Sequence, residues 1–226
     1  MQYLVELVPN KNLEKTKREI DELSMYDGFD IPDSPLGNPN ILPIAVGAIL
    51  RERLGKEKRI IINQRLYDVN ELYVHSLAIT ASSLNLELLF TKGDKPKIGK
   101  EVAHLSSEDA VKIAKSYGVR AGLILSFRKS LSEIRVRLEF PADFYLALNY
   151  SIELLKNIKE NRDKIIPYII IATEKNLQLL ESLGQRFFKK EEVMKVIEEL
   201  ETIGIKVVLI SSPKSPLHIL SKIIKK

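Results

Sequence analysis

The sequence contains no cysteine and no tryptophan. The absence of thiols excludes disulfide bonds, thiolate metal ligands and a cysteine nucleophile. Histidine is also scarce: the 3 histidines, His75, His104 and His218, lie far apart, and none has a metal-binding spacing such as His-x-x-x-His. We therefore expect no metal site, and the chemistry must come from oxygen and nitrogen groups or from a bound cofactor.

Long apolar runs are absent as well. No run approaches the roughly 18 to 20 residues that cross a bilayer. Residues 1–6 lack the basic region and apolar core of a signal peptide. The sequence thus predicts a cytoplasmic protein without a membrane span.

Several motifs of common enzymes are missing too. The chain has no Gly-x-Ser-x-Gly elbow, no Walker loop, and no Gly-x-Gly-x-x-Gly after an early strand. Nucleophilic acyl transfer, ATP-driven phosphoryl transfer and a dinucleotide-binding half-domain are therefore without support.

Neither sign of charge is in large excess. The 226 residues include 35 Lys and Arg against 30 Asp and Glu, and the resulting net charge of +5 is gathered noticeably only from Lys214 to Lys226. This surplus is too small to indicate binding to nucleic acid, so we expect no nucleic-acid partner. The length, with 45% apolar residues, excludes a disordered chain.

What the chain does have is short apolar or β-branched runs that alternate with longer stretches of helical periodicity. Residues 13–23 have one face marked at 3 to 4 residue spacing, and residues 106–117 open with a capping-box pattern. The near-continuous apolar run 165–171 is typical of a parallel strand covered on both faces. The 8 runs that we interpret as strands are residues 3–8, 28–31, 59–63, 86–90, 121–126, 143–147, 166–172 and 205–210.

This alternation predicts an α/β fold, a compact (β/α)8 TIM barrel that residues 1–226 form as a single domain. Residues 217–226 have the pattern of a basic amphipathic helix, which we interpret as closing the barrel. A membrane-surface or partner contact is the alternative for that segment. In such a barrel the active site lies at the carboxyl ends of the strands and in the loops that follow them.

Carboxylates lie at the ends of the first two predicted strands. Glu6 is inside an apolar strand, so it is either held by partners or forms a rim ion pair with a lysine. Two carboxylates, Asp30 and Asp33, belong to the stretch 30–37 at the second strand, which prolines stiffen, about where a ligand would be met. An ordinary acidic loop is the alternative for Asp33.

Amide and guanidinium groups follow the third predicted strand. Asn63, Gln64 and Arg65 end that strand, and Asp68 and Asn70 lead into the next helix. Such groups suit the recognition of polar rings or phosphates. As a motif this signal is weak, because each residue type is common.

The stretch after the fourth predicted strand is the most distinctive in the chain. Gly93 allows a sharp turn, Pro96 fixes the backbone, and Asp94 lies among three lysines, including Lys92, that would help to keep it ionised. We favour a functional loop over a plain turn. The basic loop 126–129, after the fifth strand, either meets an anionic ligand or is solvated.

Taken in order, these motifs resemble those of the methylenetetrahydrofolate reductase family, flavoprotein barrels that reduce the one-carbon unit on a folate. The resemblance runs over most of the chain, and only the fourth-strand loop is specific on its own. The matching stretches are residues 5–9 (family Phe-Glu-Phe-x-Pro), 33–37, 68–70, 93–99 (family Gly-Asp-x-Pro and Lys-x-Gly) and 141–144 (family Gly-Ala-Asp-Phe).

The resemblance implies a mechanism and a set of ligands. Glu6 would be the general acid that helps to open the folate ring, and Asp94 would lie close to a flavin, FAD or alternatively FMN. The implied partners are a folate or methanopterin-like one-carbon carrier, a nicotinamide or partner-subunit electron donor, and a second copy of the chain in a homo-oligomer. The implied binding residues are Asn63, Arg65, Lys92, Gly93 and Asp94 for the flavin, and Asp33, Gln64 and Asn70 for the substrate.

Two departures from the family pattern keep a second function open. After the fifth strand the family's Tyr-Pro-Glu-x-x-His type segment is replaced by residues 127–130, and after the sixth its Thr-Gln is replaced by Ala147 and Leu148. The first interpretation is a flavin-dependent reductase of a methylene group on a folate or related pterin. The alternative is a non-redox pterin- or flavin-binding barrel, or a subunit of a one-carbon enzyme complex.

Overall fold

A computed structural model describes residues 1–102 and 104–224. Its strands follow the order β1 to β8 in a closed barrel, and the paired strands whose register is defined are parallel. The predicted (β/α)8 fold is confirmed, and each strand boundary lies within 2 residues of its predicted position. The strands are β1 (Gln2–Glu6), β2 (Gly28–Ile31), β3 (Arg59–Arg65), β4 (Glu87–Thr91), β5 (Ala121–Ser126), β6 (Phe144–Leu148), β7 (Ile165–Ile170) and β8 (Val207–Ser211).

Helices separate the strands along the chain. The predicted capping of residues 106–117 is confirmed, since the Ser106 side chain accepts a hydrogen bond from the Asp109 amide. The α-helices are α1 (Leu13–Glu22), α2 (Pro43–Leu54), α3 (Glu71–Ser83), α4 (Ser107–Ser116), α5 (Leu131–Glu139), α6 (Ile152–Lys156), α7 (Leu177–Ser182), α8 (Val193–Thr202) and α9 (His218–Ser221). Short 3-10 helices lie at η1 (Pro35–Gly37), η2 (Arg162–Lys164) and η3 (Lys190–Glu192).

The predicted C-terminal helix is shorter than expected. Residues 217–226 were predicted as helical, but α9 covers only His218–Ser221, and residues 225–226 lie outside the described part. The Leu220 carbonyl accepts hydrogen bonds from the Tyr26 hydroxyl and from the Ile223 amide. The Ile223 bond spans three residues, as in a 3-10 turn, whereas an α-helix would use the amide four residues on. Tyr26 therefore anchors this end of the chain at a tight turn.

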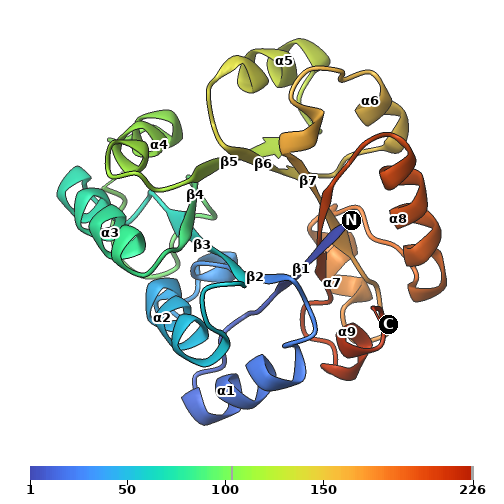
Figure 1. Ribbon diagram of the computed structural model, residues 1–226, viewed down its shortest axis with the longest axis horizontal. Coiled ribbons are helices and arrows are strands. Elements are labelled where there is room, and N and C mark those ends of the chain that lie inside the picture. The colour runs from blue at the N-terminus through green and yellow to red at the C-terminus, as the bar shows by residue number, and fades with distance from the viewer. Residues whose placement is uncertain (103, 225–226) are drawn as a thin grey trace. The chain divides into compact units, whose positions relative to one another are not determined.

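The chain divides into two compact units. Unit 2 consists of residues 7–24 and 28–123. Within it β3 pairs with both β2 and β4, and Figure 1 shows α2, α3 and α4 on the same side of these strands. Apolar side chains such as Ile62, Leu88 and Val74 are buried where the helices cover the strands.

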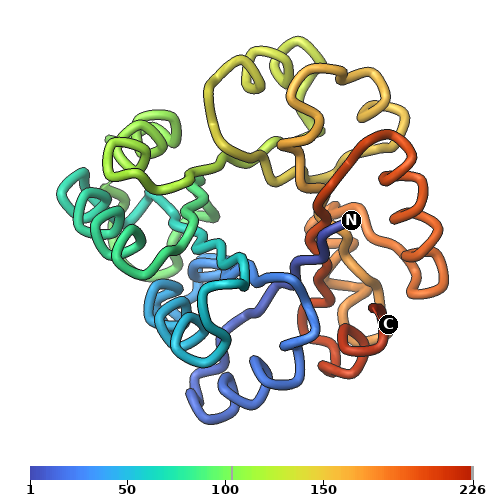
Figure 2. The backbone as a smooth tube through the Cα atoms, viewed as in Figure 1, coloured from blue at the N-terminus to red at the C-terminus, as the bar shows by residue number. Residues whose placement is uncertain are grey.

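Unit 1 consists of residues 1–6, 25–27 and 124–226. Here β1 pairs with β8, which pairs with β7, which in turn pairs with β6. In Figure 2 the blue N-terminal segment runs beside the red segment of β8, as this pairing requires. The carboxyl end of β1, which is Glu6, thus lies beside the carboxyl end of β8.

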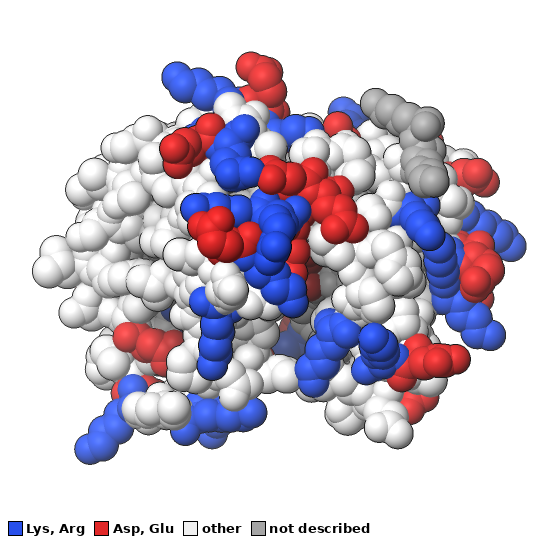
Figure 3. All heavy atoms as spheres, turned by 90° about the horizontal axis from the view of Figure 1, so that it is seen from below, with Lys and Arg blue, Asp and Glu red and all other residues white. Residues whose placement is uncertain are grey.

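Charged side chains of both signs are interspersed on the face of the molecule that Figure 3 shows. No broad basic area dominates that face, in keeping with the modest net charge of +5. Among the described residues, no helix combines the length and apolar character needed to span a bilayer.

Candidate functional site

Two loops of unit 2 that the sequence singled out are bonded to each other. They are residues 33–37 after β2 and residues 92–97 after β4. The Leu36 amide donates to the Asp94 carboxylate (Oδ2, 3.0 Å), and the Lys97 amide donates to the Gly37 carbonyl (3.0 Å). Gly37 has φ +71°, and a Cβ there would lie 2.1 Å from the Lys95 carbonyl oxygen, so only glycine permits this approach.

Arg65 joins these same two loops from the end of β3. Its guanidinium donates to the Ser34 carbonyl (3.2 Å) and the Asp94 carbonyl (2.7 Å), and it forms an ion pair with Asp68 (2.5 Å). The side chain is only 3% exposed. These contacts assign Arg65 a positioning role, and whether it also meets a ligand stays a prediction.

Asp33 and Gln64 hold each other in the same network. The Asp33 carboxylate accepts hydrogen bonds from the Gln64 side-chain amide (3.1 Å) and from the Arg65 backbone amide (3.1 Å). Burial raises the pKa of the Asp33 carboxyl, and the hydrogen bonds from the Arg65 amide and the Ser34 hydroxyl lower it by less. Both side chains therefore fix the start of the β2 loop, and their predicted contact with substrate is not tested.

Asn63 and Asp30 form a separate pair. The Asn63 Nδ2 donates to the Asp30 carboxylate (2.9 Å), while the Asn63 Oδ1 is buried and has no hydrogen-bond partner among residues 1–102 and 104–224. An unpaired buried acceptor is costly, so it indicates a group that a ligand or water satisfies. The contact of Asp30 with Asn63 depends on the register of β2 against β3, which the sequence does not show.

Lys92, Gly93 and Asn70 have different environments. Lys92 and Gly93 are exposed, and the Gly93 amide donates to the Thr91 hydroxyl (3.2 Å). Asn70 caps α3 by accepting from the Tyr73 amide (3.1 Å). The structure therefore leaves Lys92 and Gly93 accessible, whereas the Asn70 side-chain oxygen is used within the fold.

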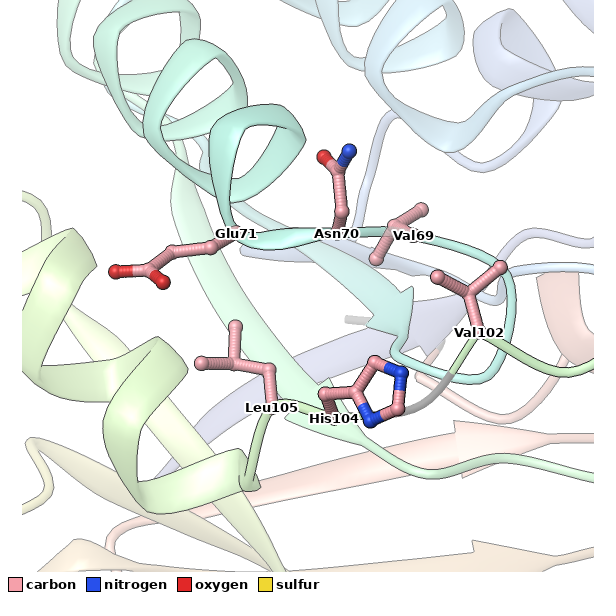
Figure 4. A pocket seen from close by; sticks show the side chains of 6 residues that line it. All are labelled: Val69, Asn70, Glu71, Val102, His104 and Leu105. Carbon is pink, nitrogen blue, oxygen red and sulfur yellow. The ribbon is translucent and has the colours of Figure 1, made fainter.

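Asn70 also lines a small cavity of about 100 Å³. Figure 4 shows Val69 and Asn70 on the segment that enters α3, with His104 and Leu105 on the segment that leads into α4. Sites for small organic ligands are typically about 300–1,000 Å³. This cavity is thus too small for a pterin or a flavin ring.

Glu6 lies in unit 1, at the end of β1. The Ser211 hydroxyl at the end of β8 donates to the Glu6 carboxylate (Oε2, 2.5 Å), and the Tyr168 side chain of β7 forms a further hydrogen bond to it. Burial is the largest influence and raises the pKa of Glu6, whereas the two hydroxyl groups lower it. Of the two arrangements predicted for Glu6, the structure has the partner-held one, without a lysine ion pair in the described chain.

Sequence reasoning missed both partners of Glu6. Tyr168 is one of the few polar side chains in the apolar run that forms β7, and Ser211 ends β8. The available signal was a polar residue at a strand end, but Ser211 is 205 residues away from Glu6 in sequence. Only the pairing of β1 with β8 brings them together.

The basic loop after β5 contacts the chain itself. Arg128 donates to the carbonyls of Leu183 and Gly184, at 2.7 Å each. Arg128 and Lys129 are exposed, as the solvated alternative expects, and the anion alternative stays a prediction. The Arg128 guanidinium also holds the segment that follows α7.

Comparisons with known proteins concern the fold. No known protein family matches the sequence, and no curated protein matches it either. An F420-dependent secondary alcohol dehydrogenase, solved with an F420-acetone adduct, is similar with a TM-score of 0.67 and 11% identity over 99% of this chain and 98% of that chain. The tryptophan synthase complex of Pyrococcus furiosus is similar with a TM-score of 0.62 and 13% identity over 93% and 86%. These likenesses support a TIM barrel and do not support membership of the methylenetetrahydrofolate reductase family.

Proposed function

We propose that this chain is an oxidoreductase that uses a flavin or deazaflavin to reduce a methylene group carried by a folate or related pterin. The observation that carries the proposal is the carboxyl of Glu6, whose pKa is raised by burial and whose orientation is fixed by Ser211 and Tyr168. A carboxyl that keeps its proton near neutral pH can act as a general acid. It lies at the carboxyl end of β1, where TIM barrels place catalytic groups.

Residues of unit 2 offer polar groups for a flavin-type ring system, which supports the proposal. The buried Asn63 Oδ1 lacks a partner among the described residues, so it suits a ring N–H donor. Lys92 and the backbone of Gly93 are accessible for the cofactor's polar groups, and Arg65 and Asp94 hold the loop that carries them. When bound, such a cofactor supplies hydride transfer.

Each remaining residue has a role in handling the proton or the substrate. Glu6 holds a proton and donates it to the side-chain nitrogen of the carrier's five-membered ring as that nitrogen leaves the methylene carbon; the lone pair of the pterin nitrogen, which keeps the carbon, then forms an electrophilic iminium. Ser211 and Tyr168 orient the Glu6 carboxyl. Asp33 and Gln64 keep the β2 loop in place for substrate contact.

One structural neighbour is named for its cofactor, which adds support for the cofactor class. That protein is an F420-dependent alcohol dehydrogenase, and F420 is a deazaflavin. Its likeness is one of fold, so F420, FAD and FMN are alternatives to be tested. The electron donor, a nicotinamide or a partner subunit, and a homo-oligomeric state in the cytoplasm are parts of the same proposal.

The alternative function is a non-redox pterin- or flavin-binding protein. It is favoured by the end of β6, where apolar Ala147 and Leu148 stand in place of the polar pair that the resembled family uses. The Leu148 carbonyl is bonded to the Phe127 amide (2.9 Å), so this strand end is used for structure.

An absorbance scan tests the proposal directly. The purified protein is mixed with FAD, FMN or F420, desalted, and scanned in the near-ultraviolet and visible range. Retained cofactor bands, followed by cofactor-dependent reduction of a methylene pterin under anaerobic conditions, are the expected result. Retained bands without turnover would favour the non-redox alternative, and a protein that retains none of the three would overturn the cofactor assignment.

A further inference from the structure

The segment after α7, residues 183–188, is held firmly in unit 1. Arg128 donates to the carbonyls of Leu183 and Gly184. The Arg186 amide donates to the side chain of Asn149 (2.9 Å), just after β6. Finally, the Phe188 amide donates to the Ile170 carbonyl of β7 (2.8 Å). The segment is thus fixed at the carboxyl ends of β6 and β7, the end of a TIM barrel that carries activity.

Two buried polar atoms near this segment lack partners. The Tyr150 hydroxyl belongs to a side chain that is only 1% exposed, and it has no hydrogen-bond partner among the described residues. The Gln185 Oε1 is also buried and unpaired within residues 1–102 and 104–224. Native structures rarely leave such groups unsatisfied unless a ligand or an ordered water meets them.

The guanidinium of Arg186 adds a positive charge near these two buried atoms. The Arg186 guanidinium lies 5.2 Å from the centroid of the Phe188 ring, and that ring is 6.3 Å from the Tyr150 ring. Burial raises the pKa of the Tyr150 phenol and the Arg186 charge lowers it, so the phenol stays protonated as a donor. Arg186 is exposed and forms no ion pair within the described part of the chain.

We propose that Tyr150, Gln185 and Arg186 form a binding site for an oxyanion, the phosphate or carboxylate of a substrate or cofactor. The phenol and the guanidinium are both donors, and rotation of the Gln185 amide presents its NH2 group as a third. The segment 183–188, which carries Gln185 and Arg186, is fixed by hydrogen bonds, so its backbone needs little ordering on binding. No part of the predicted flavin and pterin site is involved.

This inference rests on the proposed function only for the source of the anion. A nucleotide-type cofactor would supply a phosphate, and the tail of a folate-like carrier would supply a carboxylate. Anion binding itself requires no coloured cofactor, so the two ideas can fail separately. A chain that retains no flavin but binds an anion through Arg186 would refute the first and uphold the second.

Calorimetric titration of the full chain tests the site. The probes are inorganic phosphate and p-aminobenzoylglutamate, which represent the two sources. We expect one of them to bind, with affinity reduced at least about 10-fold in Arg186→Gln and about 5-fold in Tyr150→Phe, because each variant loses a donor to a charged group. Arg18→Gln, a change at an exposed arginine of α1, is the matched control and should bind as the wild type does.

The stability of Tyr150→Phe separates a binding role from a structural one. Removal of a buried unpaired hydroxyl should leave the melting temperature unchanged or raise it, while anion binding weakens. If neither probe binds, or if both variants bind as tightly as the control, the site does not exist and water satisfies the two buried atoms.

Discussion

At the residue scale, the Glu6 carboxyl is held by two hydroxyl groups and not by any cation that the structure describes. Ser211 and Tyr168 orient the carboxyl without neutralising it, and burial raises its pKa. A lysine partner would have had the opposite effect on the pKa. The environment therefore favours a protonated acid over a permanently charged group.

The first prediction concerns turnover. Glu6→Gln keeps the size and hydrogen-bonding ability of the side chain but removes its acidic proton. We expect methylene-pterin reduction to fall about 10²- to 10⁴-fold, with retention and reduction of the cofactor unchanged. Steady-state and single-turnover absorbance measurements check this. Full activity in Glu6→Gln would show that another group supplies the proton.

The second prediction concerns pH and stability at the same residue. Because burial raises the native pKa of Glu6 above its ordinary value of 4.5, the native state binds this proton more tightly than the unfolded chain does. Its stabilising contribution is complete below pH 4.5 and is lost as the pH rises through the native pKa. Glu6→Gln does not titrate, so its stability relative to the wild type should increase between about pH 4 and about pH 8.

Urea unfolding of both proteins at the two pH values measures this difference. The raised pKa of Asp33 is common to both chains and cancels in the comparison. A gap between the two midpoints that does not change with pH would contradict the assignment of a raised pKa to Glu6.

The candidate residues were easier to find in the sequence than their roles were. Asp33, Arg65 and Asp94 stood out because they follow predicted strands, yet the structure bonds them to one another across two loops. Sequence spacing cannot show this, since the contacts join residues 29 to 58 positions apart.

At the scale of elements, the β2 and β4 loops meet at Gly37. The positive φ of this residue, and the 2.1 Å distance that a Cβ would have from the Lys95 carbonyl oxygen, leave no room for a side chain. Gly55, which ends α2, also has a positive φ (+73°), but a Cβ there would meet nothing within 4 Å. Both glycines thus have a positive φ, but only at Gly37 would a Cβ meet the backbone of another loop.

This difference gives the third prediction. Gly37→Ala and Gly55→Ala both incur the cost of a left-handed conformation, and Gly37→Ala must also push the loops apart. We expect Gly37→Ala to lower the free energy of unfolding by about 1–3 kcal/mol more than Gly55→Ala does. Urea unfolding of both variants measures this, and equal losses would mean that the loop contact is unimportant.

Strands were more predictable than the ends of the chain. A buried parallel strand needs a run of apolar residues, and this requirement is visible in sequence. The end of α9 coincides with a hydrogen bond from the Tyr26 hydroxyl to the Leu220 carbonyl, between residues 194 positions apart. Local periodicity contains no information about such a distant contact.

At the scale of the whole molecule, the chain passes from unit 2 to unit 1 inside a single strand. The boundary falls between Leu123 and Ile124, within β5. A strand cannot readily keep its pairing in one half while the other half unfolds. That residues 1–226 form a single domain stays a prediction.

The fourth prediction is therefore one cooperative unfolding transition. The urea transition followed by far-ultraviolet circular dichroism should coincide with the one followed by tyrosine fluorescence. Two separate transitions would instead indicate that the two units unfold independently and would refute the single-domain prediction.

The bonded loops after β2 and β4 also constrain how this protein can be redesigned. The Asp94 carboxylate is matched to the Leu36 amide, and Lys97 is matched to Gly37. A loop grafted from another barrel at either position would bring donors without acceptors and a side chain where none fits. Successful exchange of substrate specificity at this end of unit 2 should require both loops to be transplanted together, with Arg65 retained, as one cassette.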